Sequence, residues 1–543
     1  MPITSAILEV AERDPEQLAI VGDRSRLTYG ELVERSRRTF AVIDELHGAQ
    51  ANPPRPAPET GGIPISAISV ESAFAAARFV AALAGYRAVS ATIDPRWPLE
   101  HRVHVVLATG IGVIITDAAA DADTDPATAT YPATNSDLGS ALAARGWGGT
   151  IVSLAEFEER ERAVHPAPPP AVRDSATESD EAFLLLFSSG TTSSPKAFLK
   201  TRAQYRANVA VSSAHLEPLP GVATFAPGPV SYSLTLYAVI ECLATGGSVH
   251  VADAFDPFGV AARIRDEAIT RIVAVPAVVQ TLTDAARRDP AACAGIELVV
   301  TGGANLPAAI REGLARVLPD ARLISYYGAA EIGFIGDSRD GDGTGISVYP
   351  GVEASVRDAA GSPVPAGEPG TLYIRAEACS TGYVAGTTDE VLRGADGWAT
   401  VHDQARIVGG RLQLLGRAGD IAITGGHKVS LPEVERAFVD MPGVAAACAV
   451  ALPHATLGSV VALVIEAGPL DAQDPQTPQD PQTAQDPQTP DRAALAAWAA
   501  ARLAPQFVPR RWYRVERLPR TVGGKLRRGE TAELALSPAA VRL

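Results

Sequence analysis

Short apolar runs alternate with longer amphipathic segments along the first two thirds of the chain. Three of these runs are FLLLF at residues 183–187, RIVAV at 271–275 and ELVV at 297–300. Largely apolar runs of this length are typical of strands that are buried on both faces. Each is followed by a glycine- or proline-bearing turn and then by an alanine- or leucine-rich amphipathic segment. This rhythm predicts βαβ units, and therefore parallel sheets with helices on both faces.

The pattern changes near Val348. From there, short strands and turns such as TLYIRA and GRLQLLGR predict an antiparallel barrel or meander. After Asp420 the pattern predicts a compact α+β unit with helices at residues 431–439 and 492–503.

Tracts rich in proline, glycine or small polar residues interrupt these elements. Residues 51–62 predict a surface loop, and within the tract 117–180 we expect a helix and a strand between 138 and 162. Residues 474–491 form a threefold hexapeptide repeat, DPQTPQ-DPQTAQ-DPQTPD. Such a segment cannot bury enough surface to offset the ordering of its backbone. A disordered insertion is therefore expected near 470–491.

Charge and composition exclude several classes of partner. The 543 residues carry a net charge of −15, which disfavours nucleic acid and anionic membranes. The N-terminus lacks a basic leader, and no run of 18 apolar residues occurs, so we expect a cytoplasmic protein that does not span a membrane. The cysteines lack metal-ligand spacing and are expected to be reduced thiols packed in cores. They are Cys242, Cys293, Cys379 and Cys448.

The strongest local signal is FLLLFSSGTTSSPK, from Phe183 to Lys196. Small residues let backbone N–H groups approach a phosphate, hydroxyls add donors, and the lysine adds a positive charge. The segment is not a Walker loop, because it lacks the second glycine before the lysine and the hydroxyl after it. On these residues alone, a phosphate-binding loop and a polar surface loop after a core strand are equally good interpretations.

Several other segments follow in a fixed order. GGANLP (302–307) and YYGAAE (326–331) follow presumed parallel strands, at the edge where open α/β sheets bind ligands. The remaining segments are LTYGEL (27–32), the stretch 81–100, GWATVHD (397–403), GRAGD (416–420), GGHKVSLPEVE (425–435) and LPRTVGGKLRR (518–528). In order and spacing these motifs resemble the superfamily of adenylate-forming enzymes, which includes acyl- and aryl-CoA ligases, peptide-synthetase adenylation domains and luciferases. The resemblance covers nearly the whole chain and is nearest to small acyl-CoA ligase-like members.

The resemblance implies an α/β fold with two domains. A large N-terminal domain, residues 1–415, would contain two doubly wound βαβ lobes and a small β-barrel-like subdomain. A hinge at residues 416–420, with Gly419 at the hinge position, would lead to a small mobile α+β domain at 421–543. The resemblance also implies that ATP and Mg²⁺ bind. Coenzyme A or the pantetheine of a carrier protein is the implied thiol acceptor, because GGHKVSLPEVE is similar to the loop that lines the pantetheine tunnel.

Individual roles follow from the matching positions. Lys196, on the phosphate loop, and Lys525, on the terminal loop of the small domain, match catalytic lysines. Glu331 matches the magnesium-binding carboxylate, a hard oxygen ligand, and Asp403 and Arg417 match residues that reach the ribose. The full set of implied nucleotide-binding residues is Ser188, Ser189, Gly190, Thr191, Thr192, Lys196, Gly302, Gly303, Ala304, Tyr326, Tyr327, Gly328, Asp403 and Arg417.

The chain departs from the family pattern at several positions. Ser193 and Ala197 replace glycines of the phosphate loop, Ala330 replaces a threonine before Glu331, and Val401-His402 precedes the ribose aspartate where threonine-glycine is typical. The hinge position, often acidic or lysine, is Gly419. These departures raise the alternative of a weakened or redirected active site.

The acid pocket is expected at the start of a helix near residue 233. Amino-acid-activating members place an aspartate where this chain has Ser233, so an α-amino acid substrate is disfavoured. The pocket candidates are Tyr232, Ser233, Leu236, Ala329 and Ala330. The leading hypothesis is a ligase that adenylates an aryl or acyl acid and transfers it to a thiol. The alternatives are a diazotase that activates nitrite and diazotises an aromatic amine, and a degenerate nucleotide-binding protein.

Overall fold

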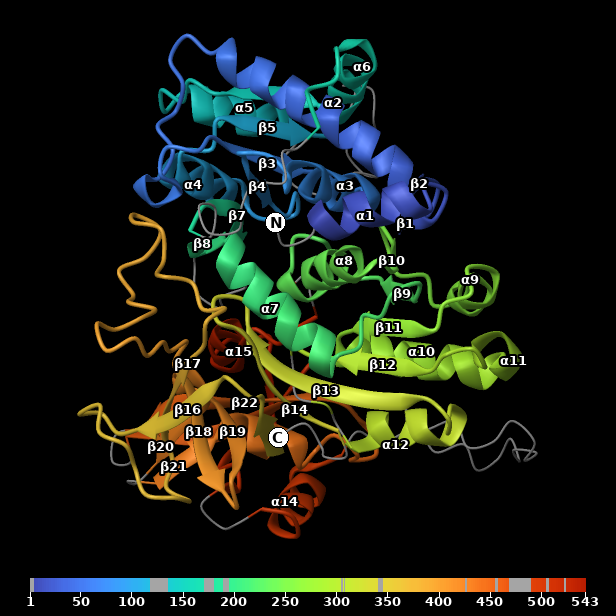
Figure 1. Ribbon diagram of the computed structural model, residues 1–543. Helices are drawn as coiled ribbons and strands as arrows, with labels where there is room; N and C mark the ends of the chain where they lie inside the picture. The colour runs from blue at the N-terminus through green and yellow to red at the C-terminus, as the bar shows by residue number, and fades with distance from the viewer. Residues whose placement is uncertain are drawn as a thin grey trace. The chain divides into compact units, whose positions relative to one another are not determined.

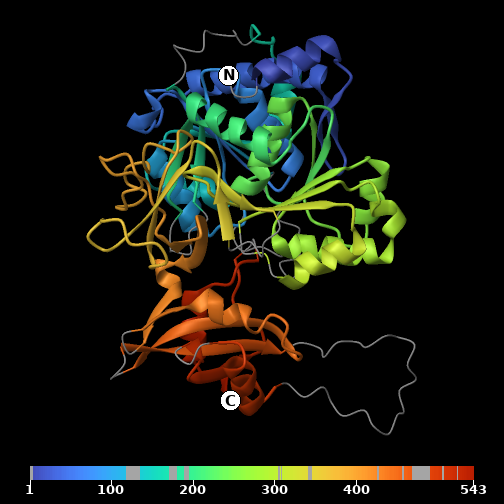
Figure 2. The ribbon, with the colours of Figure 1, turned by 60° about the horizontal axis from the view of Figure 1, so that its bottom comes forward.

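The fold is described by a computed structural model of the chain (Figures 1 and 2). It covers residues 4–117, 135–169, 180–188, 195–303, 306, 308–339, 345–424, 427–454, 458–467, 490–503, 507–521 and 524–543. These residues form two compact units, Met1–Ala354 with Ile374–Val401 and Ser355–Tyr373 with His402–Leu543.

The first sheet of the first unit is built from buried strands. Its strands are β3 (Ile65–Ser69), β4 (Val89–Thr92), β5 (Val113–Thr116), β6 (Thr150–Ser153), β7 (Ala182–Phe187) and β8 (Ala197–Thr201). Its helices are α2 (Tyr29–Gly48), α3 (Ala73–Leu83), α4 (Leu99–Thr109), α5 (Asn135–Ala143) and α6 (Leu154–Ala163). The strand order is β6-β5-β3-β4-β7-β8, with only the β7–β8 pair antiparallel. Helices α2, α3 and α6 pack on one face, and α4 and α5 on the other.

The second sheet of this unit is also mainly parallel. Its strands are β1 (Leu18–Val21), β2 (Arg26–Thr28), β9 (Ala223–Ala226), β10 (Ser248–Val251), β11 (Arg271–Ala274), β12 (Leu298–Thr301), β13 (Arg322–Ala329), β14 (Gly333–Ser338) and β15 (Gly345–Val348). The order is β15-β14-β13-β12-β11-β9-β10-β1-β2. Its helices are α1 (Thr4–Arg13), α7 (Arg202–His215), α8 (Ser233–Thr245), α9 (Val260–Asp266), α10 (Pro276–Arg288), α11 (Pro290–Cys293) and α12 (Ala308–Val317). Helices α1, α7 and α8 share one core, and α9 to α12 share the core of the other face.

The predicted buried strands are confirmed, because every residue of β7, β11 and β12 is buried. One detail of the prediction is wrong. The segment after the phosphate loop is not a helix but strand β8, which pairs antiparallel with β7. Helix α7 starts only after Thr201, whose side chain accepts the Gln204 N–H while the Gln204 side chain accepts the Thr201 N–H. This capping box fixes the helix start.

The second unit contains an antiparallel meander and an α+β part. The meander strands are β16 (Glu353–Arg357), β17 (Gly370–Arg375), β18 (Asp403–Val408) and β19 (Arg411–Arg417). The other strands are β20 (Ile421–Thr424), β21 (His427–Ser430), β22 (Val444–His454), β23 (Gly458–Ala467), β24 (Arg511–Val515) and β25 (Val541–Arg542). The helices are α13 (Leu431–Arg436), α14 (Arg492–Ala500) and α15 (Arg528–Ala535). Strands β20 to β25 form one sheet. Helices α13 and α14 pack on one face of this sheet and α15 on the other.

This architecture confirms the α/β fold class and the change to antiparallel strands after Val348. The predicted helices near 431 and 492 form, and side chains of Ser430 and Asp491 cap them. The tract 138–162 contains a second helix, α6, in addition to the expected helix and strand. Most of the hexapeptide repeat lies outside the described residues. Among the described residues, no helix has the length and apolar character that crossing a membrane requires.

The cysteine prediction is confirmed, since all four thiols are free and buried. Burial raises the pKa of each, to about 11 for Cys242 and about 12 for Cys448. Because the thiolate is the reactive form, we expect the native protein to release less than one equivalent of chromophore from Ellman's reagent. Unfolding in guanidinium should release four equivalents. Rapid reaction of any thiol in the native protein would contradict this packing.

Candidate active site

The predicted phosphate loop begins and ends on one antiparallel pair of strands. Phe187, at the end of β7, pairs with Ala197, at the start of β8. Just beyond, the Ser188 N–H donates to the Lys196 carbonyl at 2.8 Å, and the Lys196 N–H donates to Ser188 Oγ at 3.3 Å. The residues outside the described part of the loop are Ser189, Gly190, Thr191, Thr192, Ser193 and Ser194. The structure therefore fixes both ends of the loop, and the phosphate contacts between them stay a prediction.

Tyr383 lies between the two predicted active-site charges of this unit. The Lys196 Nζ is 5.6 Å from the centroid of the Tyr383 ring, and the Tyr383 hydroxyl donates to Glu331 Oε1 at 3.2 Å. The Lys196 Nζ also forms an ion pair of 2.5 Å with Glu390 Oε1. Glu331 is largely buried, with 7% of its surface exposed. The structure thus brings together Lys196 and Glu331, which are 135 positions apart in the sequence.

A buried lysine holds the backbone at Glu331. The Lys200 Nζ donates to the carbonyl oxygens of Glu331, at 2.8 Å, and of Ala378, at 2.6 Å. The Ser380 N–H donates to the same Glu331 carbonyl at 2.9 Å. Lys196 and Lys200 are four residues apart along an extended segment, so they share a face. Strand β8 therefore carries Lys200, which holds the Glu331 carbonyl, and Lys196, directly before the strand, reaches the ring of Tyr383, whose hydroxyl donates to the Glu331 carboxylate.

The segments expected along the adenine lie on neighbouring strands. Gly302 and Gly303 follow β12, and Tyr326 and Tyr327 lie on β13, which runs parallel to it. A Cβ on Gly302 would lie only 2.5 Å from the Tyr326 ring, so only glycine allows this close approach. β13 is longer than expected: it includes Tyr326, Tyr327, Gly328 and Ala329, and pairs antiparallel with β14 over this stretch. Ala304 lies outside the described residues.

The candidate acid pocket begins at helix α8, which starts at Ser233 as expected. The Tyr237 hydroxyl donates to the Ala330 carbonyl at 2.7 Å, which joins the helix to the end of β13, next to Ala329. Leu236 is fully buried in the core. Tyr232 lies beside the buried carboxylate of Asp94; burial, followed by the Asp94 charge, raises the pKa of Tyr232.

Nothing in the sequence indicated that Asp94 lies next to the candidate pocket residue Tyr232. Its carboxylate accepts two hydrogen bonds from the Arg96 guanidinium, at 2.9 and 3.0 Å. Because two guanidinium nitrogens of Arg96 already donate to this carboxylate, Asp94 is a poor partner for the ammonium group of an amino acid. The serine at position 233 therefore still disfavours an α-amino acid substrate, because Asp94 does not replace the missing aspartate.

In the second unit, the two predicted ribose ligands begin and end a pair of strands. Asp403 on β18 lies directly opposite Arg417 on β19 in the antiparallel register. His402, just before Asp403, has a left-handed backbone with φ 63°. A side chain is unfavourable in this conformation, which gives a physical reason why glycine is typical there in the family that the sequence resembles.

Lys525 is exposed in the second unit, and its backbone is hydrogen-bonded to Thr521. The Thr521 N–H donates to the Lys525 carbonyl at 2.7 Å, and the Lys525 N–H donates to Thr521 Oγ1 at 3.1 Å. Gly524, with φ 79°, makes the turn possible, and a β-bridge between Arg520 and Leu526 closes its base. These contacts of the described residues hold the Lys525 backbone in place.

Comparison with protein-family models identifies the chain. Residues 7–384 match the AMP-binding enzyme model, and residues 433–525 match the AMP-binding enzyme C-terminal domain. The chain belongs to the AMP-binding enzyme family. The two matches span both units and confirm the resemblance on which the site residues were assigned.

Relatives of this AMP-binding enzyme include named ligases. An uncharacterised acyl–CoA ligase of Bacillus subtilis, YhfT, is 26% identical over 64% of this chain and 68% of its own. A salicyl-AMP ligase / salicyl-S-ArCP synthetase of Mycobacterium tuberculosis is 27% identical over 86% of this chain and 82% of its own. ATP-bound MatB from Rhodopseudomonas palustris has the same fold, with a TM-score of 0.79 and 21% identity over 98% of this chain and 99% of its own.

The residues of this AMP-binding enzyme fit a magnesium ion bound together with ATP. Glu331 offers one carboxylate, which accepts from the Tyr383 hydroxyl, and the described residues contain no group of three His, Cys, Asp or Glu side chains that could hold a metal alone. Magnesium commonly takes one or two carboxylates and completes its shell with water and phosphate oxygens. A single carboxylate, joined through Tyr383 to the lysine that ends the predicted phosphate loop, matches that requirement.

Glu390 is expected to compete with ATP for Lys196. Because the two side chains form an ion pair, a phosphate that binds Lys196 would have to displace the carboxylate. Partly exposed pairs contribute about 0.2–1 kcal/mol, so Glu390→Gln should tighten binding of a non-hydrolysable ATP analogue by up to about fivefold, measured by calorimetry. Asp389→Asn, the same charge change at the neighbouring position, is the control. Weaker binding by the Glu390 variant would contradict the competition.

Proposed function

We propose that this enzyme is an ATP- and magnesium-dependent ligase that adenylates a non-amino carboxylic acid. The aryl or acyl acid would displace pyrophosphate from ATP, and the adenylate would then pass its acyl group to the thiol of coenzyme A or of a carrier protein. The names of the relatives support this proposal, since they include acyl–CoA and salicyl-AMP ligases.

The observation that carries the proposal is the cluster of Lys196, Tyr383 and Glu331. Attack of a carboxylate on the α-phosphate of ATP brings negative charges together, so the site must neutralise and align them. Lys196 would meet the phosphates, and Glu331 would hold the magnesium ion, which neutralises phosphate charge when bound. Lys200 keeps the Glu331 backbone in place for that task.

The second unit would complete the site. Asp403 and Arg417 would bind the ribose, and Lys525 would bridge the acid and the α-phosphate. We propose that residues 421–543 swing about Gly419 between the two half-reactions. A Cβ at Gly419 would meet no atom within 4 Å, so packing does not require glycine there and its backbone freedom is the simpler reason for its presence.

The alternatives receive less support. None of the relatives named above is a diazotase. A degenerate protein would have no need for the charged residues, yet Lys196, Glu331, Asp403 and Lys525 are all present. Ala330 uses its backbone carbonyl to accept from Tyr237, a contact that the loss of a threonine hydroxyl leaves intact.

Acid-dependent exchange of labelled pyrophosphate into ATP tests the proposal. A panel of benzoic, cinnamic and short aliphatic acids, with and without Mg²⁺, should identify at least one acid that supports exchange. Coenzyme A and a pantetheinylated carrier protein would then be compared as acceptors. Release of AMP that requires nitrite and an aromatic amine would favour the diazotase, and ATP binding without turnover would favour the degenerate protein.

A further inference from the structure

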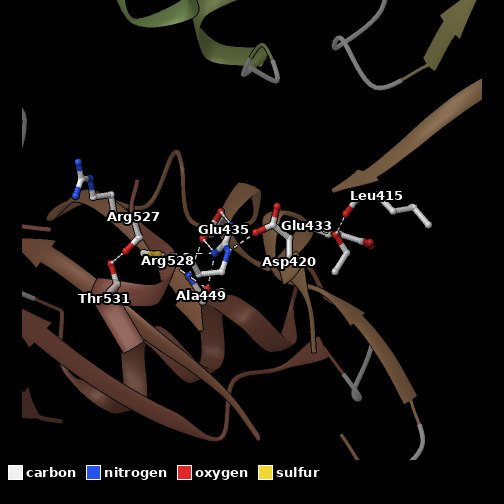
Figure 3. A network of polar contacts seen from close by, with 10 residues as sticks. Leu415, Asp420, Glu433, Glu435, Ala449, Arg527, Arg528 and Thr531 are labelled. Carbon is white, nitrogen blue, oxygen red and sulfur yellow. Dashed lines mark hydrogen bonds and ion pairs between the residues drawn. The ribbon is translucent and has the colours of Figure 1, made fainter. Parts of the chain in front are cut away.

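Arg528 is the centre of a polar network in the second unit (Figure 3). Its Nε donates to Asp420 Oδ1 at 2.6 Å, and both terminal nitrogens contact the Glu435 carboxylate. A terminal nitrogen also donates to the Ala449 carbonyl at 2.5 Å. The Ala449 N–H donates to Glu435 at 2.8 Å. The side chain is 18% exposed, so this is a largely buried arginine with two carboxylate partners.

These partners come from separate parts of the unit. Asp420 is the residue after the proposed hinge glycine, Glu435 lies on α13, and Ala449 lies on β22. The planar guanidinium donates in several fixed directions at once. Arg528 can therefore hold the hinge segment, a helix and a strand together.

Arg528 also ends the turn that carries Lys525. Only two residues separate them, and the intervening Arg527 N–H donates to the Pro519 carbonyl at 2.9 Å. On the N-terminal side Thr521 accepts a hydrogen bond from the Lys525 N–H, and on the C-terminal side helix α15 starts at Arg528. Any movement of Arg528 would be transmitted to the turn through this short segment.

We propose that Arg528 is a positioning residue that fixes the Lys525 turn to the hinge segment at Asp420. With this contact, rotation about the hinge moves Lys525 as part of a rigid unit and presents its ammonium group in one defined position. The inference rests on the proposed function, because it assigns Lys525 a role in adenylation. A purely stabilising role for the network is the competing explanation.

The neighbouring Arg527 provides a matched control. Its side chain is 43% exposed and pairs with Glu530 three residues on, and Figure 3 shows it directed away from the Arg528 network. Arg528→Gln and Arg527→Gln therefore remove the same charge one residue apart. Asp420→Asn is a milder variant that weakens the hinge contact and leaves Glu435 in place.

Two measurements test the proposal in the full-length protein. Amide hydrogen exchange should show that Lys525 and Arg527 lose protection by about tenfold or more in Arg528→Gln and not in Arg527→Gln. Pyrophosphate exchange at saturating ATP and acid should fall at least tenfold in Arg528→Gln and less in Asp420→Asn, with the ATP dissociation constant within about twofold of wild type. In a Lys525→Ala background, Arg528→Gln should have less than about twofold further effect.

Each outcome separates the possibilities. Unchanged protection of the Lys525 turn in Arg528→Gln and Asp420→Asn would overturn the proposal, whatever the activity. An undiminished rate effect in the Lys525→Ala background, with a lowered melting temperature, would assign the network a stabilising role only. Failure of every acid to support exchange in the wild type would reject the proposed ligase function, and the hydrogen exchange would still decide whether Arg528 orders the turn.

Discussion

Replacing Lys525 by alanine is expected to lower the rate of acid-dependent pyrophosphate exchange by about 100- to 1000-fold, the usual effect of removing one preorganised charge-stabilising contact. The side chain is exposed and only its backbone donates to Thr521, so its removal should leave the fold intact. The expected loss therefore lies in the rate at saturation, while binding of ATP to the first unit should change little. Exchange assays at several ATP and acid concentrations separate the two effects.

A second cation at the same turn provides the control. Arg520 forms the base of the turn, and its side chain is paired with Glu466 at 3.6 Å. If only the local positive charge mattered, Arg520→Ala would reduce exchange as strongly as Lys525→Ala. We expect Arg520→Ala to retain most of the activity. Full adenylation activity in Lys525→Ala would remove Lys525 from the reaction.

The sheets could be predicted from the sequence because buried strands leave a local signal. Residues 183–187, 271–275 and 297–300 are apolar throughout or nearly so, and the strands that they form are buried on both faces. Strand β8 could not be predicted in the same way. Its sequence, AFLKT, is short and contains a lysine, and its identity depends on pairing with β7 across a loop.

The candidate site could be predicted only where motifs mark it. Lys196 and Glu331 lie in motifs, and the structure joins them through Tyr383. Tyr383 and Glu390 follow the sequence STG in a segment without hydrophobic periodicity. Their contacts with Lys196 and Glu331 span 52 to 194 positions, a relation that only the folded chain establishes. Glycine next to Tyr383 is the one local sign that could have drawn attention to it.

No local sequence pattern indicated that Lys200 is buried, but the amino-acid composition makes this lysine unusual. The sequence has 47 lysines and arginines, and only four are lysines, at positions 196, 200, 428 and 525. The other three lie in the motifs that resemble the family. A chain that uses arginine almost everywhere else keeps lysine at position 200, where the ammonium group fits between two carbonyl oxygens.

Lys200 should make the stability of the protein depend on pH. Burial lowers the pKa of Lys200 from 10.5 to about 8 in the folded protein. Between these two values the unfolded chain binds more protons than the folded one, so the free energy of unfolding should rise with pH. At about 1.4 kcal/mol per pH unit, the full gain between pH 8 and 10.5 is about 3 kcal/mol, and it should be absent from Lys200→Met.

Urea unfolding of both proteins between pH 7.5 and 10.5, without ATP or magnesium, measures this dependence. Other groups titrate in this range, but their contributions cancel in the difference between wild type and Lys200→Met. The sign of that difference at pH 7.5 is set by two opposing effects, loss of a buried charge and loss of hydrogen bonds to two carbonyls. Its rise with pH depends on the lysine alone. Parallel curves for the two proteins would mean that Lys200 keeps an ordinary pKa, and that burial does not penalise its charged form.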